Sequence, residues 1–189
     1  PEAPLAQAKI AEAHRFLEDD QQTYMTRKKL FANYHTGTDW WNAVEDEAAR
    51  ERAMQLSEHA LRANVNLLLE TALETGDVNL YAQAVDDTRE YLEIFPEDSN
   101  AVMLHWNMAL TLDSKLDRPA EAFGEFIEIS NRYWGARFQE KAAKNAIAIA
   151  QEMTDIDTLQ RAEVLPLNIG DMREQLEEGK LELRRSLQL

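Results

Sequence analysis

The sequence contains no cysteine, few glycines and prolines, and no apolar run long enough to cross a bilayer. The lack of cysteine excludes disulfide bonds, thiolate nucleophiles and zinc–thiolate sites. Only six glycines and five prolines interrupt 189 residues, so long segments can form helices. The longest charge-free apolar run lies near residues 101–112 and is too short for a membrane-spanning helix. We therefore expect no direct membrane span.

Positive charge is also scarce. The chain carries 35 acidic residues against 20 lysines and arginines, a formal net charge of −15. A nucleic-acid binder needs cationic charge against phosphate, so we expect no nucleic-acid partner. The acidic excess is greatest from Glu45 to Asp98, where 14 acids face four bases. This stretch can steer a basic partner, or it can be a solvated surface that keeps the protein in solution.

The residues that are abundant predict an all-α fold. Alanine, leucine, glutamate and glutamine fill the long segments, and no run of β-branched residues alternates with period two. Short connections predict antiparallel helical hairpins. Turn residues and apolar spacing predict helices over 4–34, 80–95, 101–113, 119–133, 136–153 and 171–187, and either one helix over 40–75 or two with a break at 64–66.

Two short segments of the chain are nearly the same. Residues 90–94 read EYLEI and residues 125–129 read EFIEI, an offset of 35 residues. Within the second copy, AEAFGEF places a small residue, Ala122, one turn before the large Phe126. A period near 34 residues with paired helices resembles the tetratricopeptide repeat, in which each unit is one helical hairpin.

The resemblance is degenerate and covers about residues 62–153. Ala84 and Pro96 are twelve residues apart, the interval that the family uses. Thr88 departs from the family because a large residue is usual there, and Trp134 stands where a second proline would be. The resemblance implies a short solenoid of stacked hairpins, because a single hairpin cannot bury its own apolar face.

The resemblance also divides the chain and suggests a location. Residues 1–60 would form a long helical hairpin packed on the repeats, 61–153 the repeats, and 154–189 a linker with a capping helix, all in one continuous domain. The segment YLEIFPEDSNA at 91–101 is similar to bacterial cell-envelope tetratricopeptide proteins, which favours the periplasm over the cytoplasm. The start PEAPLAQ, without methionine, fits a removed signal or anchor segment, or a trimmed chain.

The function implied by the resemblance is a non-enzymatic scaffold. Such stacks leave a groove that binds a peptide or partner protein, here in the assembly of an envelope complex. In the family, groove positions come from the first helix of each hairpin. Carried onto this chain they are Asn66, Leu69, Met103, Trp106, Leu110, Phe138, Lys141 and Asn145.

Two features of this set have a second interpretation. Trp106 is a candidate binding anchor, but its apolar surroundings equally predict a core residue. Arg137, Lys141 and Lys144 form a basic face at helical spacing, suited to an acidic peptide, yet Lys144 can instead pair with Glu140 on the same helix.

Enzyme and metal motifs are not recognisable. The four histidines are His14, His35, His59 and His105, and no two fall within five residues, so we expect no metal site and no cofactor. The main alternative is a structural subunit that self-associates into a homo-oligomer. Ile10, Leu17, Tyr24 and Phe31 recur every seven residues in the first predicted helix and favour that alternative. A helical ligand or metal carrier is a third class.

Overall fold

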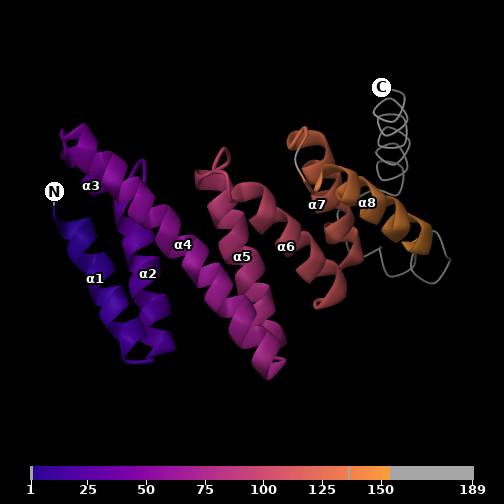
Figure 1. Ribbon diagram of the computed structural model, residues 1–189, viewed down its shortest axis with the longest axis horizontal. Coiled ribbons are helices and arrows are strands. Elements are labelled where there is room, and N and C mark those ends of the chain that lie inside the picture. The colour runs from indigo at the N-terminus through magenta and orange to yellow at the C-terminus, as the bar shows by residue number, and fades with distance from the viewer. Residues whose placement is uncertain (1, 136, 154–189) are drawn as a thin grey trace. The chain divides into compact units, whose positions relative to one another are not determined.

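The predicted all-α fold is confirmed. A computed structural model describes residues 2–135 and 137–153, and this part of the chain contains eight α-helices and no strand (Figure 1). The chain divides into two compact units, residues 1–101 and residues 102–189, which are described one at a time. None of the described helices combines the length and the apolar character needed to cross a membrane. The helix predicted over 171–187 lies outside the described residues.

The first unit begins with a hairpin where one long helix was predicted. Helix α1 spans Ala3–Phe16 and α2 spans Asp20–Tyr34, so the prediction of a single helix over 4–34 is wrong. Glu18 adopts a left-handed conformation, with φ of 56°, and reverses the chain. Asp19 then caps α2 by accepting a hydrogen bond from the Gln22 backbone nitrogen at 3.0 Å. The two helices pack against each other, which the heptad spacing alone did not predict.

The long helix of the first unit is α4, Glu47–Thr75. It is preceded by the short α3, Asp39–Ala43, and an extended link at 44–46. Asp46 starts α4 by accepting hydrogen bonds from the backbone nitrogens of Ala48 and Ala49. The chain breaks there and not at 64–66, where Asn64 remains helical and buried and donates from its side-chain nitrogen to the Tyr24 carbonyl of α2 at 3.0 Å.

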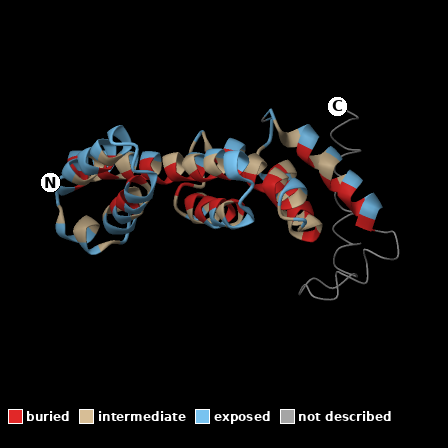
Figure 2. Cartoon of the chain, turned by 90° about the horizontal axis from the view of Figure 1, so that it is seen from below, coloured by how far each residue is buried: buried red, intermediate tan, exposed pale blue. Residues whose placement is uncertain are grey.

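A second hairpin of this unit joins α4 to α5, Val78–Ile94, as the sequence predicted. Gly76 ends α4 in the left-handed region, with φ of 72°, and its amide donates to the Ala72 carbonyl. Asp77 accepts from the Asn79 backbone nitrogen and caps α5. Helix α2 packs on α4, and α4 on α5, so the unit is built from adjacent helical layers whose buried residues face inward (Figures 1 and 2).

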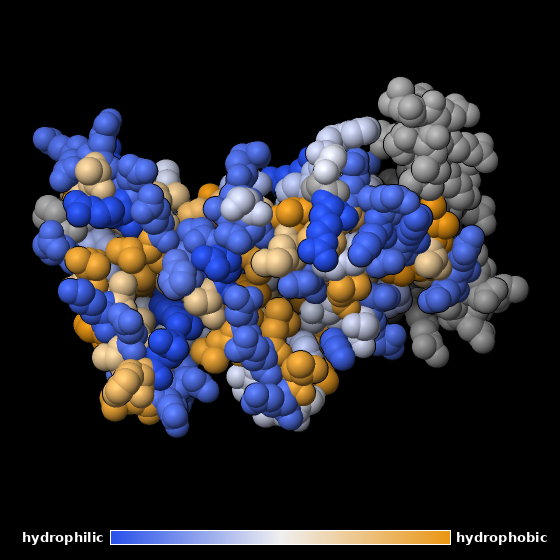
Figure 3. All heavy atoms as spheres, viewed as in Figure 1, coloured by the Kyte–Doolittle hydropathy of each residue, from blue (hydrophilic) through white to orange (hydrophobic). Residues whose placement is uncertain are grey.

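The second unit is described from α6, Ala101–Ser114, through α7, Pro119–Arg132, to α8, Gln139–Met153. Pro119 opens α7, where its missing amide proton costs no hydrogen bond. Helices α7 and α8 pack closely because α8 presents Ala142 and Ala146, both buried, one turn apart. The visible molecular face is mostly hydrophilic, with separate apolar patches (Figure 3).

Burial follows the sequence repeat in α5 and α7. Residues that are 35 positions apart in α5 and α7 are buried in both helices. The buried pairs of positions are Val85 and Ala120, Asp87 and Ala122, Thr88 and Phe123, and Tyr91 and Phe126. The next helices do not keep this offset, since α6 begins at residue 101 and α8 at residue 139, which is 38 residues later. Phe138 therefore precedes α8, whereas Met103 lies within α6. Pro96 ends α5 at Ile94, which corresponds to Ile129 at the offset of 35. Helix α7 has no proline after Ile129 and continues for about one more turn, to Arg132.

Candidate functional site

Trp106 is the centre of an aromatic cluster in the second unit. Its ring stacks on Phe138, with centroids 5.1 Å apart and planes 14° apart. Its edge meets the ring of Phe126 on α7, with centroids 5.4 Å apart. Phe126 is fully buried, whereas Trp106 and Phe138 are half-buried. Trp106 therefore packs against buried Phe126 on one side, while part of its surface stays accessible.

Residues next to this cluster extend it along α6. Met103 lies one turn before Trp106 and is 43% exposed, which is high for a methionine. Leu110 follows one turn after and is half-buried. Because residues three and four apart share a face of a helix, these three side chains form one apolar strip on α6. We call Met103, Trp106 and Phe138 the aromatic face.

Positive charge borders the aromatic face. The guanidinium carbon of Arg137 lies 5.4 Å from the centroid of Phe138, in cation–π contact. Since α8 begins at Gln139, Arg137 precedes the helix and does not belong to its first turn. Lys141 is exposed on α8 and has no ion pair within the described residues. Lys144 pairs with Glu140, so the surface pairing considered for this lysine is present.

The remaining predicted groove residues are distributed over both units. Asn145 is half-buried on α8. Asn66 and Leu69 lie on α4 of the first unit, where Asn66 is exposed and Leu69 half-buried. Asn66 also lines a cavity of about 190 Å³ together with Arg15, Thr23 and Arg27. Burial and the nearby Arg15 lower the pKa of Arg27.

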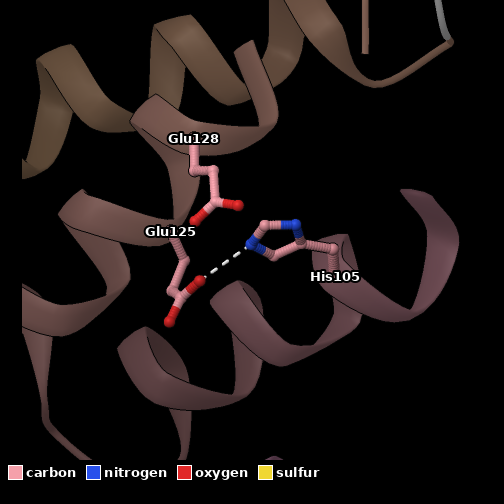
Figure 4. A group of neighbouring side chains, drawn as sticks. All are labelled: His105, Glu125 and Glu128. Carbon is pink, nitrogen blue, oxygen red and sulfur yellow. Dashed lines mark hydrogen bonds and ion pairs between the residues drawn. The ribbon is translucent and has the colours of Figure 1, made fainter. Parts of the chain in front are cut away.

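A polar cluster lies between α6 and α7, and sequence reasoning did not identify it (Figure 4). His105 is 1% exposed, and its Nε2 lies 2.7 Å from Oε2 of Glu125. Its Nδ1 lies 3.3 Å from the Tyr133 hydroxyl, whose ring meets the imidazole edge-on. Glu128, one turn beyond Glu125, turns its carboxylate toward the same imidazole and accepts a hydrogen bond from Arg132 at 3.2 Å.

The sequence carried only a weak signal for this cluster. The two glutamates are three residues apart on one helix, a spacing that puts side chains on one face. His105 makes two hydrogen bonds, one through each ring nitrogen. What brings His105 to these carboxylates is the packing of α6 on α7, a contact between residues 20 positions apart in the chain.

The first unit contains a buried ionic network between α2 and α5. Asp87 is 4% exposed, accepts from the Tyr24 hydroxyl at 3.0 Å and pairs with Lys28 at 2.9 Å. Burial raises the pKa of Asp87 although Lys28 opposes the shift. Burial and the Asp87 charge raise the pKa of Tyr24 to about 12. Lys28 also pairs with Glu90, and these contacts raise its pKa against the effect of burial.

A second buried phenol joins α4, α5 and the loop after α5. Tyr91 is fully buried, and its hydroxyl lies 2.8 Å from a Glu58 oxygen and 2.7 Å from an Asp98 oxygen. Burial, then these two carboxylates, raise the pKa of Tyr91, so it stays a neutral donor. Asp98 also accepts from the Asn100 amides, and together these bonds outweigh burial and lower its pKa. Both networks hold helices of the first unit in place.

Comparison with known protein families, with curated proteins and with solved structures finds no match. The function of this chain is therefore inferred from its own residues.

Proposed function

We propose that this chain is a tetratricopeptide-like scaffold that binds a polypeptide partner through the aromatic face. The observation that carries the proposal is the half-buried stack of Trp106 on Phe138, beside exposed Met103 and Arg137. Tryptophan and arginine are the residues that most often dominate the energy of protein interfaces. The side of Trp106 that packs on Phe126 holds the indole in one orientation, which lowers the entropy cost of binding.

The burial pattern of α5 and α7 supports the proposal. Helices α5 and α7 bury corresponding residues at an offset of 35, as expected for the second helices of two successive repeats. In that arrangement α6 and α8 are first helices, and their exposed side chains line the groove. Helices α6 and α8 begin 38 residues apart. Counted from these helix starts, Lys141 and Lys144 on α8 correspond to Met103 and Trp106 on α6. The groove of the second unit then has an apolar half on α6 and a basic half on α8.

The chemistry of this surface defines the partner as an acidic segment with apolar side chains. Arg137 and Lys141 are cations in a chain of net charge −15, so an acidic partner is attracted only where such cations gather. Met103 offers apolar contact area that adapts to its partner, because its side chain is unbranched and flexible. Trp106 offers a large and rigid apolar surface. We therefore assign the partner as a peptide that carries aspartate or glutamate within a few residues of a large apolar residue.

The test is selection from a library of displayed random peptides with the full chain as bait. The expected result is enrichment of acidic–apolar peptides whose affinity falls with added salt.

Trp106→Ala should weaken the binding of the selected peptides by about 30-fold, the loss of an interface anchor that contributes about 2 kcal/mol. Arg137→Glu should weaken them without disturbing the core, since Arg137 is exposed. Lys9→Glu, an exposed change on α1, is the matched control and should have no effect beyond the general charge change. Enrichment of basic peptides, or equal losses in Lys9→Glu and Arg137→Glu, would contradict the assignment.

A second candidate function is self-association through the N-terminal hairpin. Phe16 and Leu17, at the turn between α1 and α2, are 86% and 72% exposed, and Ile10 on α1 is also exposed. Apolar side chains of this size in one place are typical of a contact surface. Replacing Phe16 and Leu17 by serine should reduce the mass measured by analytical ultracentrifugation if the chain oligomerises there. A native chain that remains monomeric at high concentration would rule out this candidate.

A further inference from the structure

We propose that His105, Glu125 and Glu128 form a binding site for one divalent transition-metal ion, with zinc as the representative ion. The three side chains come from two helices of the second unit and converge on one point (Figure 4). One nitrogen and two carboxylate oxygens lie within 4.8 Å of one another. This site is independent of the proposed peptide binding.

The geometry is close to what a metal requires. Around a tetrahedral zinc ion with bonds of about 2.0 Å, neighbouring ligand atoms are about 3.3 Å apart. His105 Nε2 and Glu125 Oε2 already lie 2.7 Å apart. Glu128 has a half-exposed side chain on the same face of α7, so a change of rotamer brings its oxygen to the ion without moving the backbone. The fourth position is left to water.

The surroundings of His105 favour ligation through Nε2. Its other nitrogen, Nδ1, contacts the Tyr133 hydroxyl at 3.3 Å, and the edge-on packing of the two rings fixes the imidazole plane. Histidines that bind metals are usually held in this way by a polar group on the second nitrogen, which selects the tautomer. In the free protein the Nε2 proton is donated to Glu125. Metal binding at Nε2 would transfer this proton to Nδ1, which can donate it to the Tyr133 hydroxyl.

The donor set also selects the class of ion. An imidazole nitrogen with carboxylates suits zinc and its neighbours in the first transition series, whereas magnesium and calcium prefer oxygen ligands alone. Glu128 is bound to Arg132 at 3.2 Å in the free protein, so the metal has to compete with this surface ion pair. Surface ion pairs contribute little to stability in water, much less than a zinc–carboxylate bond in a three-ligand site.

The test is isothermal titration of the full chain with zinc chloride after treatment with a chelator. The expected result is one zinc ion per chain. Glu125→Gln and Glu128→Gln should each weaken binding about tenfold or more, because each removes one ligand and leaves the fold intact. Tyr133→Phe should weaken it by about tenfold through loss of the contact to Nδ1. Glu140→Gln, on exposed α8, is the matched control and should bind zinc as the native chain does.

Long-range proton–nitrogen NMR of the imidazoles adds a readout that is independent of affinity. Zinc should shift the Nε2 resonance of His105 and leave the resonances of His14, His35 and His59 unchanged. Replacing His105 itself is not needed, which matters because its burial makes loss of folding a separate cause. No zinc uptake, or native affinity in both glutamine variants, would show that these residues do not bind metal.

Discussion

The buried pair of Lys28 and Asp87 provides the sharpest test of how the first unit is held together. We expect Lys28→Met to destabilise it, because methionine keeps the apolar stem and removes only the charge. Asp87 is 5% exposed as a side chain and receives hydrogen bonds from Lys28 at 2.9 Å and from Tyr24 at 3.0 Å. After the substitution only the Tyr24 hydroxyl remains. The substitution therefore isolates the contribution of one charged donor to a buried carboxylate.

The size of the effect follows from the exposure of the two partners. Removing one member of a fully buried ion pair costs about 3–5 kcal/mol. Lys28 is 29% exposed, and a single charged hydrogen bond contributes about 1.5–3 kcal/mol, so we expect a loss of about 2 kcal/mol at pH 7. The pair of Lys28 with the more exposed Glu90 adds little.

The loss should depend on pH in a definite direction. Burial raises the folded-state pKa of Asp87 above its unfolded value, so its ionisation weakens the fold as pH rises through the folded pKa. Without Lys28 this pKa rises further. The cost of Lys28→Met is therefore largest at neutral pH and shrinks below the folded pKa, where Asp87 is protonated in both proteins.

Urea unfolding followed by circular dichroism measures the loss, and hydrogen exchange of α2 and α5 localises it. Lys29→Met is the matched control, since Lys29 is the exposed neighbour, and should change stability by less than about 0.5 kcal/mol. In an Asp87→Asn background the cost of Lys28→Met should fall to about 0.5 kcal/mol, which gives a coupling energy of about 1.5 kcal/mol. Equal effects of the Lys28 and Lys29 substitutions at pH 7 would refute the reasoning.

Two further predictions concern the first unit. Gly76→Ala should lower the free energy of unfolding, measured in urea, by about 1 kcal/mol, because alanine is strained at a φ of 72°. The added methyl group meets no atom within 4 Å, so backbone strain is the whole effect. An unchanged free energy of unfolding would contradict the left-handed end of α4. Asp98→Asn should lower stability at neutral pH, since hydrogen bonds from Asn100 and Tyr91 overcome burial and hold the pKa of Asp98 below its ordinary 3.8. The stability that Asp98 contributes is present above its unfolded-state pKa and is lost as pH falls through its folded-state pKa. The free energies of unfolding of the native chain and of Asp98→Asn should therefore converge in acid. A difference that stays constant down to pH 2 would contradict this prediction.

Helix ends marked by glycine or proline were predictable from the sequence. Gly76 ends α4, Pro96 follows α5 and Pro119 opens α7, each within two residues of the expected position. The turn at Glu18 was missed because a non-glycine residue adopts a positive φ there. Its only signal was Asp19 followed three residues later by Gln22, a spacing typical of a helix start.

Contacts between helices were harder to predict than the helices. The repeated segments place Tyr91 and Phe126 at matching positions, and each is buried within its own unit. The sequence repeat did not predict that Trp106 stacks on Phe138. Relative to the repeat, α7 is extended by about one turn, so the residues after α7 no longer follow the offset of 35. The pairing of His105 with Glu125 has no local pattern at all, because it arises only when α6 packs on α7.

Indole NMR of the full chain tests the central proposal, peptide binding at the aromatic face, most directly. The chain has four tryptophans, of which Trp40 and Trp41 lie in the first unit and Trp106 and Trp134 in the second. Titration with a selected acidic–apolar peptide should shift the Trp106 indole resonance, saturate at one equivalent, and leave Trp40 and Trp41 unchanged. A peptide that binds while the Trp106 resonance stays in place would contradict the assignment of this face as the binding surface.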